Sequence, residues 1–391
     1  MNKVLFIFNS KAMKKMIFNL LIFVFPLLLL LGPNYYVLFS SKENFHNIDG
    51  TIHNFENQKY LIGYLYNEDN YRYIKYKALS EKKATVVALG SSRVLPFRKE
   101  MFEADFYNAG FAVDNVRDFQ GFLSCIPEKN LPDYLILGLD QWMFNDAWND
   151  ATERTPKPHW TKNNSFDAGK GVKKTENLYP DLFTGQLSLS MQTNAAPSGV
   201  ERIGLNALLH STGFRNDGSA YYGELIQKLM EKDTSISDYN FRNTFRRINN
   251  GNERFQFGNQ VSEKALTVLN QLLVFCKSNK IQVIGFIPPF ADAVYTKMKN
   301  SGNYEYMEKL YPALKPIFNR HDFEIYGYDD VSSVGSSDLQ TTDGFHGGEN
   351  TYVRIMIDML RNKSSLNKVS KLEKLEKDLN TAVSNYVVYP Y

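Results

Sequence analysis

The sequence predicts an α/β fold, a three-layer sandwich in which a parallel sheet lies between two layers of helices. Three apolar runs, at residues 85–89, 133–140 and 281–287, lack the regular polar positions of a strand with one solvated face. Such runs are typical of parallel strands that are buried on both faces. Segments with helical spacing alternate with these strands, and right-handed connections place helices on both sides of a parallel sheet.

Size and composition limit the function classes. A chain of 391 residues can hold one large domain with an insertion. Its formal net charge of +3 is too small to indicate nucleic-acid binding, so we expect no nucleic-acid partner. Cys125 and Cys276 lie in apolar helical contexts, and we expect free core thiols, with a disulfide as the alternative. No spacing is typical of a metal or haem site, and we predict neither a metal nor a cofactor.

The N-terminal segment predicts a membrane anchor. Residues 16–31 form an apolar run that, extended to residue 39, is long enough to cross a bilayer. Lysines precede this run, so the positive-inside rule predicts a cytoplasmic start and an exported remainder: Lys3, Lys11, Lys14 and Lys15. A cleaved signal peptide is the alternative, but the small-residue cleavage pattern is absent after Leu31. We therefore predict residues 1–39 as a cytoplasmic N-terminus and a single-pass anchor in the cell membrane.

Residues 40–79 connect this anchor to the first strand of the sheet. Residues 40–57 are polar and are predicted as a membrane-proximal linker. Aromatic residues at helical spacing predict a helix over 60–79 that packs beneath the sheet.

The first half of the sheet is predicted within residues 80–140. After the strand at 85–89, a second strand is expected at 106–111. Asp114 is typical of a helix N-cap, and we expect that helix to reach about Cys125. The strand at 133–140 follows the same pattern as the first.

Residues 141–260 interrupt this alternation. They are rich in Asn, Gly and Lys, with helical patterns near 200–209 and 221–232, and their length predicts an insertion with its own structure. The domain as a whole is predicted over 80–361. Its second half contains the elements that follow the insertion: a helix at 262–278, the strand at 281–287, a helix at 303–320 and a final helix at 349–361.

Residues 362–391 are predicted as an amphipathic helix and tail. Apolar residues lie on one face of this helix: Leu366, Val369, Leu372, Leu375, Leu379 and Val383. Packing of this face onto the domain is one interpretation, and contact with a partner or a membrane surface is the other.

The residues that indicate chemistry follow the first strand. Gly90-Ser91-Ser92 stands at the carboxyl end of that strand, where ligands bind in open α/β sheets. A nucleophilic serine needs a base and an acid that orients the base. Asp343 and His346 lie three residues apart in a glycine-rich loop before the final helix, so the carboxylate can hold the imidazole Nδ1–H. A second Gly-Ser-Ser, at residues 335–337, follows no apolar strand and is predicted as a polar loop.

This ordered set resembles the SGNH (GDSL-like) hydrolase superfamily, and more closely its membrane-anchored branch related to DltD-type and alginate O-acetylation proteins. The first family block matches residues 86–92, with Ser92 at the nucleophile and Ser91 in place of the usual Asp. The second block matches 108–110, and the last block matches 343–346. The resemblance covers residues 80–140 and 262–361. It implies a catalytic triad of Ser92, His346 and Asp343, and an oxyanion hole that uses the amides of Ser92 and Gly110.

The third family block differs from the family pattern. The family has Gly-x-Asn-Asp, whose Asn side chain donates to the oxyanion, whereas residues 138–141 read Gly-Leu-Asp-Gln. An ionised carboxylate beside an oxyanion is repulsive, and one oxyanion donor is worth about 3 kcal/mol. Asp140 is therefore protonated or turned away, or Gln141 replaces it, or activity is weak or absent.

The resemblance implies an exported, membrane-anchored serine esterase or O-acyltransferase that forms an acyl-enzyme. The expected substrates are acyl esters of a cell-envelope or secreted polysaccharide, either an acylated glycan or a lipid-linked substrate, with a membrane acyltransferase as a partner. A non-catalytic binding or assembly protein on an SGNH scaffold is the alternative, and Asp140 favours it.

Two neighbours of the motif are candidates for substrate contact. Arg93 follows the nucleophile and suits an anionic substrate, with a solvent-exposed or ion-pair role as the alternative. Trp142, Trp148 and Trp160 follow the third strand, where their rings would stack on sugars or pack within the insertion.

Overall fold

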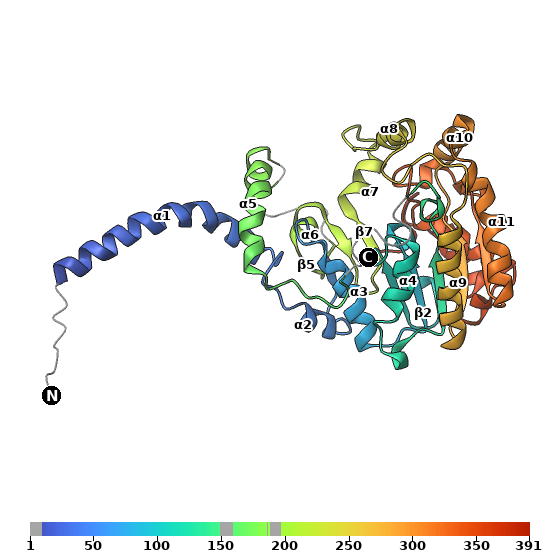
Figure 1. Ribbon diagram of the computed structural model, residues 1–391, viewed down its shortest axis with the longest axis horizontal. Helices are drawn as coiled ribbons and strands as arrows, with labels where there is room; N and C mark the ends of the chain where they lie inside the picture. The colour runs from blue at the N-terminus through green and yellow to red at the C-terminus, as the bar shows by residue number, and fades with distance from the viewer. Residues whose placement is uncertain (1–9, 149–158, 186, 188–196) are drawn as a thin grey trace.

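The computed structural model describes residues 10–148, 159–185, 187 and 197–391 (Figure 1). A long N-terminal helix, α1 (Ser10–Ser40), extends away from the rest of the described chain. Within its segment Met13–Ser40, the most apolar stretch of 18 residues has a mean hydropathy of 2.4, and the other described residues leave this stretch uncovered. The predicted apolar helix is therefore present, and its length and composition are sufficient to span a membrane. Lys3 lies outside the described residues.

The central sheet has five parallel strands in the order β3-β2-β4-β8-β9. In chain order these are β2 (Val86–Gly90), β3 (Phe106–Gly110), β4 (Tyr134–Gly138), β8 (Gln282–Ile287) and β9 (Glu324–Gly327). The first four were predicted, and the α/β class with a parallel sheet is confirmed. The strand β9 was not predicted, because this edge strand is short and mostly half-buried and therefore lacks an apolar run.

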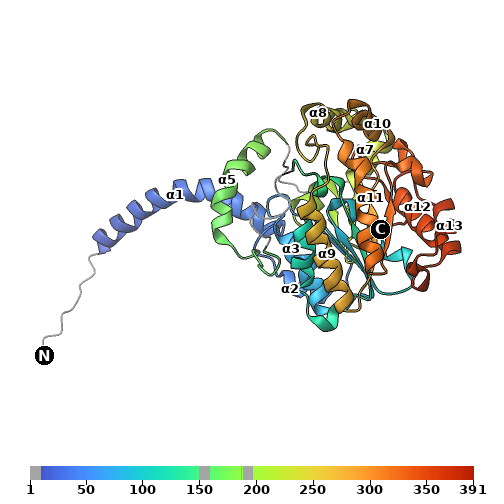
Figure 2. The ribbon, with the colours of Figure 1, turned by 45° about the vertical axis from the view of Figure 1, so that its right-hand side comes forward.

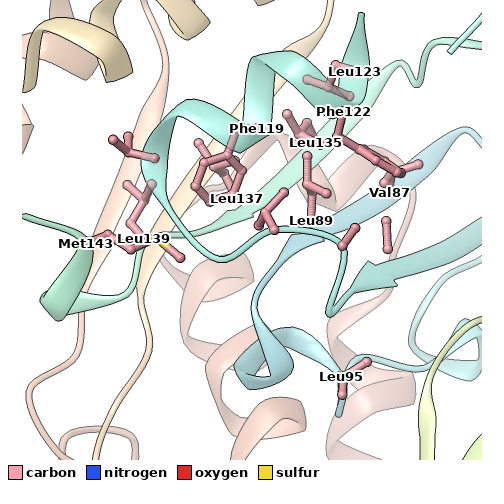
Figure 3. Packing of buried hydrophobic residues seen from close by; sticks show 14 of the residues in the cluster. Val87, Leu89, Leu95, Phe119, Phe122, Leu123, Leu135, Leu137, Leu139 and Met143 are labelled. Carbon is pink, nitrogen blue, oxygen red and sulfur yellow. The ribbon is translucent and has the colours of Figure 1, made fainter. Parts of the chain in front are cut away.

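Side chains alternate between the two faces of this sheet. On one face Val87, Leu89, Leu135 and Leu137 pack against helix α4 (Val116–Leu123), as Figure 3 shows. Two long helices belong to the same cluster: α9 (Glu263–Ser278) and α11 (Glu305–Arg320). On the other face Val86, Ala88 and Ile136 pack against α12 (Glu349–Arg361). The free thiol of Cys276 lies in the first cluster, and Cys125 is also free, as predicted.

The cap of α4 differs from the prediction. Asn115, and not Asp114, is the N-cap, because its side chain accepts the Arg117 N–H while Asp118 accepts the Asn115 N–H. This reciprocal pair is a capping box. The Asp114 side chain does not cap the helix and forms an ion pair with Arg72 instead.

The predicted linker is folded structure. Residues 40–57 contain the helix α2 (Ile48–His53), and the expected helix over 60–79 begins only with α3 (Asn70–Glu81). Residues 60–62 instead form β1 (Tyr60–Ile62), which pairs with strands of the insertion in a second sheet of order β5-β1-β6-β7. Those strands are β5 (Glu201–Ile203), β6 (Thr212–Phe214) and β7 (Ala220–Tyr222). The local sequence does not show this arrangement because its partners lie about 140 residues away.

The remaining described helices lie in the insertion and in the second half of the chain. They are α5 (Ala168–Phe183), α6 (Leu205–His210), α7 (Gly223–Met230), α8 (Arg242–Asn250), α10 (Asp292–Ser301) and α13 (Leu372–Asn380). Helix α13 lies beside α12 (Figure 2), with Leu375 buried, so the tail packs onto the domain. Its helical pattern is interrupted at Ser370, whose hydroxyl donates to the Met101 carbonyl at 2.7 Å.

A buried lysine ties the two sheets together. Lys75 of α3 is fully buried, and its ammonium donates to the carbonyls of Asn108, at 3.0 Å, and Gly218. Burial lowers the pKa of Lys75 to about 7, although Asp217 opposes the shift. An exposed lysine in an unfolded chain titrates near pH 10.4. Between these values the unfolded state binds more protons, so Lys75 makes stability rise with pH.

We therefore expect the unfolding free energy to rise by roughly 2 kcal/mol more between pH 7 and pH 9 than it does in Lys75→Met. Thermal unfolding of both proteins at the two pH values measures the difference. Lys77→Met, on the same helix, is the matched control. Its unfolding free energy should rise between pH 7 and pH 9 as much as that of the unmodified protein. An equal rise of the unfolding free energy in Lys75→Met and in the unmodified protein would contradict this prediction.

Candidate active site

Ser92 stands at the carboxyl edge of the central sheet. The strand β2 ends at Gly90, and the chain turns at once into a 3₁₀ helix over Ser92–Val94, where the Ser91 hydroxyl accepts the Arg93 N–H at 3.2 Å. A Cβ on Gly90 would lie 2.6 Å from the Val94 side chain, so the turn requires glycine. This turn leaves Ser92 half-buried at the edge where the sheet opens.

The three residues predicted as a triad lie in one hydrogen-bonded chain. Ser92 Oγ is 2.8 Å from His346 Nε2. His346 Nδ1 is 2.8 Å from Asp343 Oδ2 and 3.0 Å from Oδ1. With the proton on Nδ1 held by the carboxylate, Nε2 is free to accept from the serine hydroxyl. The structure thus brings together residues 254 positions apart in the geometry that a nucleophilic serine needs.

Asp343 is held by its own loop. Its Oδ1 accepts the N–H groups of Phe345 and His346, both at 2.7 Å. Burial alone would raise the pKa of Asp343, but the charge and hydrogen bond of His346, together with these two amides, lower it below the usual range. Asp343 is therefore a carboxylate at neutral pH and can stabilise an imidazolium.

The insertion supports this loop through Asp238. Its Oδ2 accepts the Gly344 N–H at 3.0 Å and the Thr244 hydroxyl at 2.7 Å. A Cβ on Gly344 would lie 2.7 Å from Val294, so the loop fits here only with glycine. Asp238 was not predicted as a site residue, because an aspartate in an irregular polar segment has no distinctive local pattern.

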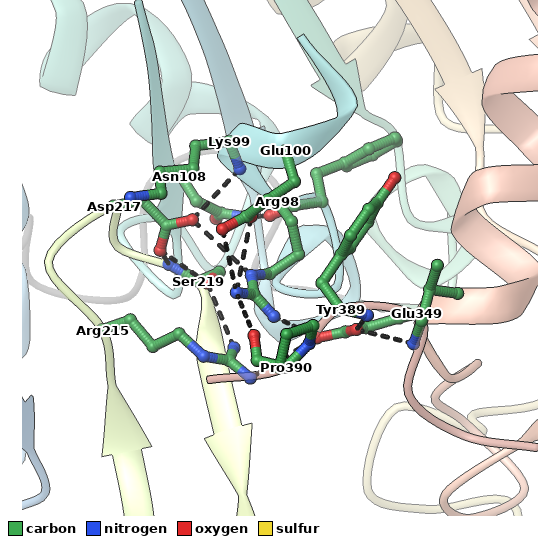
Figure 4. Close-up of polar contacts among 12 residues, drawn as sticks. Arg98, Lys99, Glu100, Asn108, Arg215, Asp217, Ser219, Glu349, Tyr389 and Pro390 are labelled. Atoms are coloured by element: carbon green, nitrogen blue, oxygen red, sulfur yellow. Dashed lines mark hydrogen bonds and ion pairs between the residues drawn. The ribbon is translucent and has the colours of Figure 1, made fainter. Parts of the chain in front are cut away.

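The C-terminal peptide supports the same loop from the far side. Glu349 begins α12 three residues after His346, and its Oε1 is 2.7 Å from Arg98 Nη1 (Figure 4). Its Oε2 accepts the Val388 and Tyr389 N–H groups at 2.9 and 3.1 Å. All these charged side chains are buried, and breaking such a pair costs about 3–5 kcal/mol. The helix that follows His346 is therefore rigidly placed.

Ser92 lines a cavity of about 300 Å³. Its other lining residues are Glu68, Asp69, Arg72, Phe111, Asp114 and Arg254. Arg72 forms an ion pair with Asp114, and Arg254 Nη2 is 3.5 Å from the same carboxylate. The cavity beside the serine is thus strongly polar. These charges were not predicted as site residues, because they come from the segment before β2, from the turn between β3 and α4, and from the insertion.

Two of the lining residues have a left-handed backbone. Phe111 has φ of 71° and Arg254 has φ of 76°, and neither is glycine. The neighbouring Glu253 has φ of 49°. Such conformations cost about 1–3 kcal/mol each and tend to occur at functional sites. Here they orient one aromatic ring and one guanidinium toward the cavity that contains Ser92.

Two of the residues considered for the oxyanion hole, Gly110 and Asp140, are engaged elsewhere. The Gly110 N–H donates to the Asn108 side chain at 2.8 Å. Asp140 is fully buried, with Oδ1 3.4 Å from Arg93 Nη1. Burial raises the pKa of Asp140, and Arg93 opposes this shift. Gln141 does not replace it, because its amide donates to the Pro288 carbonyl at 2.8 Å and its oxygen accepts from Arg93 at 2.7 Å.

Arg93 and Trp142 do not face a substrate, and the structure corrects both predictions. Arg93 is 1% exposed and donates to the carbonyls of Pro288 and Pro289, both at 2.7 Å. Trp142 is also 1% exposed and stacks on Phe345 with a centroid separation of 4.9 Å. The 3₁₀ turn over Gln141–Phe144 directs its side chains into the core.

The other two tryptophans also pack inside. Trp160 is buried and its Nε1 donates to the Ala112 carbonyl at 2.8 Å, while Trp148 packs against the main core. Among the described residues, no group of three or more His, Cys, Asp or Glu side chains is placed to hold a metal ion.

Comparison with known proteins found no match to any family model, curated protein or solved structure. The interpretation of the site rests on its geometry.

Proposed function

We propose that the protein is a membrane-anchored serine esterase or O-acyltransferase. The observation that carries this proposal is the chain of hydrogen bonds from Ser92 through His346 to Asp343, with distances of 2.8 Å at both steps. The cavity on which Ser92 opens supports it, because a nucleophile needs room for the reacting ester.

The proposed reaction has two displacements. His346 Nε2 takes the proton from Ser92 Oγ as this oxygen attacks the ester carbonyl carbon. The tetrahedral intermediate collapses, the bond to the leaving oxygen breaks, and His346 gives its proton to the departing alcohol. Water or a glycan hydroxyl then attacks the acyl-serine, with His346 as the base, and releases the acid or the new ester.

The oxyanion requires donors in this scheme. We assign the Ser92 N–H as one oxyanion donor, because amides in the first turn of a helix lack an acceptor within that helix. Gly110 supplies the second donor only after Asn108 releases its amide, and Asp140 supplies none while it is paired with Arg93. We therefore expect slower turnover than a complete oxyanion hole would give.

The fold is consistent with the proposed family. A five-stranded parallel sheet with helices packed on both faces supports a three-layer sandwich of the SGNH type, in the branch with a membrane anchor. The N-terminal apolar helix fits such an anchor, with the domain on the extracytoplasmic side by the positive-inside rule.

The cavity favours a polar substrate with a short acyl group. Phe111 is the one apolar side chain among the described residues that line it, and six charged or hydroxyl-bearing residues surround the rest. A long acyl chain would lose its hydrophobic stabilisation there. We propose an acylated glycan or lipid-linked saccharide of the cell envelope as the substrate, with a membrane acyltransferase as the donor partner.

A second candidate function is that of a non-catalytic binding or assembly protein on the same scaffold. The observations that favour it are the Gly110 amide, which is occupied by Asn108, and the pairing of Asp140 with Arg93.

Acyl-ester turnover by the full chain in detergent separates the two functions. We expect hydrolysis of p-nitrophenyl acetate and release of acetate from acetylated polysaccharide, with p-nitrophenyl palmitate a much poorer substrate. A folded protein that turns over none of these esters would support the binding function instead.

A further inference from the structure

The helix α5 lies across the C-terminal end of α1, beside the domain, in both Figure 1 and Figure 2. The Tyr35 hydroxyl donates to the Ala168 carbonyl at 2.8 Å, where α5 begins. Leu178 is buried in a cluster that includes Val37 of α1. Asp181 accepts from the Tyr66 hydroxyl, which belongs to the body of the protein. Specific contacts thus fix α5 to both the membrane helix and the domain.

One of these contacts satisfies a backbone group of α1. Pro33 has no N–H, so the Leu29 carbonyl, four residues earlier, has no donor within the helix. The Tyr179 hydroxyl of α5 lies 3.2 Å from this carbonyl and 2.7 Å from that of Leu30. An unsatisfied carbonyl in hydrocarbon costs several kcal/mol. The tyrosine therefore has a clear physical role if this part of α1 lies in lipid.

The position of Tyr179 along α1 indicates its depth. With Lys14 and Lys15 at the inner surface, about 20 residues at 1.5 Å each cross the apolar core of about 30 Å. The core then ends near residue 35, and Leu29 and Leu30 lie inside it. A helix that crosses α1 at this level runs roughly along the membrane plane, with its Tyr179 end below the outer surface.

Exposed aromatic side chains surround this crossing. Phe183, at the end of α5, is 85% exposed, and Phe166, just before α5, is 64% exposed. Tyr36 and Phe39 of α1 are 62% and 69% exposed. Aromatic residues gather at the boundary between lipid and water in membrane proteins. If these rings lay in water, their apolar surface would be uncovered. In a bilayer, lipid would cover this surface.

We propose that α5 is an interfacial helix that lies in the outer leaflet beside α1, with Phe183 and Phe166 in contact with lipid. The domain is then seated on the bilayer at a fixed height and is not held on a mobile tether. This inference rests on α1 spanning a membrane and is independent of the esterase function.

Site-specific fluorescence in lipid nanodiscs tests the proposal. The full chain, with Cys125→Ser to remove the half-buried thiol, receives one environment-sensitive label at Phe183→Cys. The controls carry the label at Ile22→Cys, which is exposed on α1, or at Leu339→Cys, which is exposed on the domain. The nanodiscs contain phosphatidylcholine and phosphatidylglycerol, with doxyl-labelled lipid or aqueous iodide as the quencher.

We expect the label at 183 to resemble that at 22, with blue-shifted emission, strong quenching by doxyl lipid and several-fold weaker quenching by iodide than at 339. Adding Tyr179→Phe should increase iodide quenching at 183. A label at 183 that iodide reaches as well as at 339, while 22 is quenched by lipid, would overturn the proposal for α5. Absence of lipid quenching at both 22 and 183 would overturn its premise that α1 spans the membrane.

Discussion

Ser92→Ala is expected to lower kcat/KM for p-nitrophenyl acetate by about 10⁴- to 10⁶-fold. The substitution removes the oxygen that forms the acyl bond, while leaving the fold intact because the Ser92 side chain is half-buried and, among the described residues, bonds to His346 alone. Steady-state turnover in detergent, with thermal unfolding of the same samples, measures both effects. The unfolding temperature should stay close to that of the unmodified protein.

The second Gly-Ser-Ser of the chain supplies the matched control. Ser337 occupies the same place in its tripeptide as Ser92 but is exposed on a loop. Ser337→Ala should keep full activity. Comparable rates for Ser92→Ala and the unmodified protein would remove Ser92 from the mechanism.

Asp343→Asn is expected to lower kcat by about 10⁴-fold. The asparagine oxygen retains the role of acceptor for the Phe345 and His346 amides, so the loop keeps its shape. The asparagine no longer selects the histidine tautomer with its proton on Nδ1. In the other tautomer Nε2 already carries a proton, so His346 cannot accept the proton of the Ser92 hydroxyl. Single-turnover rates with p-nitrophenyl acetate isolate this chemical step.

Asp322→Asn serves as the control for Asp343, because this carboxylate is 87% exposed and pairs with Lys277 at the surface. It should leave kcat unchanged. A kcat for Asp343→Asn within tenfold of the unmodified protein would mean that Asp343 does not orient His346.

The lowered pKa of Asp343 also has a consequence for stability. A carboxylate whose pKa is lower in the folded state stabilises the protein above its unfolded pKa, near 3.9, and this contribution is lost as pH falls through the folded value. The difference in stability between Asp343→Asn and the unmodified protein should therefore shrink as the pH drops below 4.

The strands that are buried on both faces could be predicted from the sequence. Residues of β2, β4 and β8 form continuous apolar runs, and the burial of both faces in the structure explains why. The strands β1 and β9 could not be predicted in this way. Strands of three and four residues are determined by the strands they pair with, and they are too short to show a sequence pattern of their own.

The same limit applies to the site. Asp343 and His346 are three residues apart, so one local motif predicted their contact. Arg254 and Asp238 reach the site through the tertiary placement of the insertion, which no local pattern records. Arg93 and Trp142 were wrongly predicted to face a substrate, because closeness to the motif in the sequence does not determine the direction in which a side chain points.

The engagement of Gly110 did have a signal in the sequence. An Asn side chain commonly accepts the backbone N–H two residues later, and Asn108 stands two residues before Gly110. The spacing of Asn108 and Gly110 therefore predicts that the Gly110 N–H is already hydrogen-bonded and is not a free oxyanion donor.

Covalent labelling tests the identity of the nucleophile most directly. A fluorophosphonate reacts with a serine that a histidine activates, and peptide mass spectrometry locates the adduct on the full chain in detergent. We predict a single phosphonyl adduct on Ser92, retained in Ser337→Ala and greatly reduced in His346→Ala. A folded protein that takes up no label, or takes it up at a serine other than Ser92, would contradict the proposed mechanism.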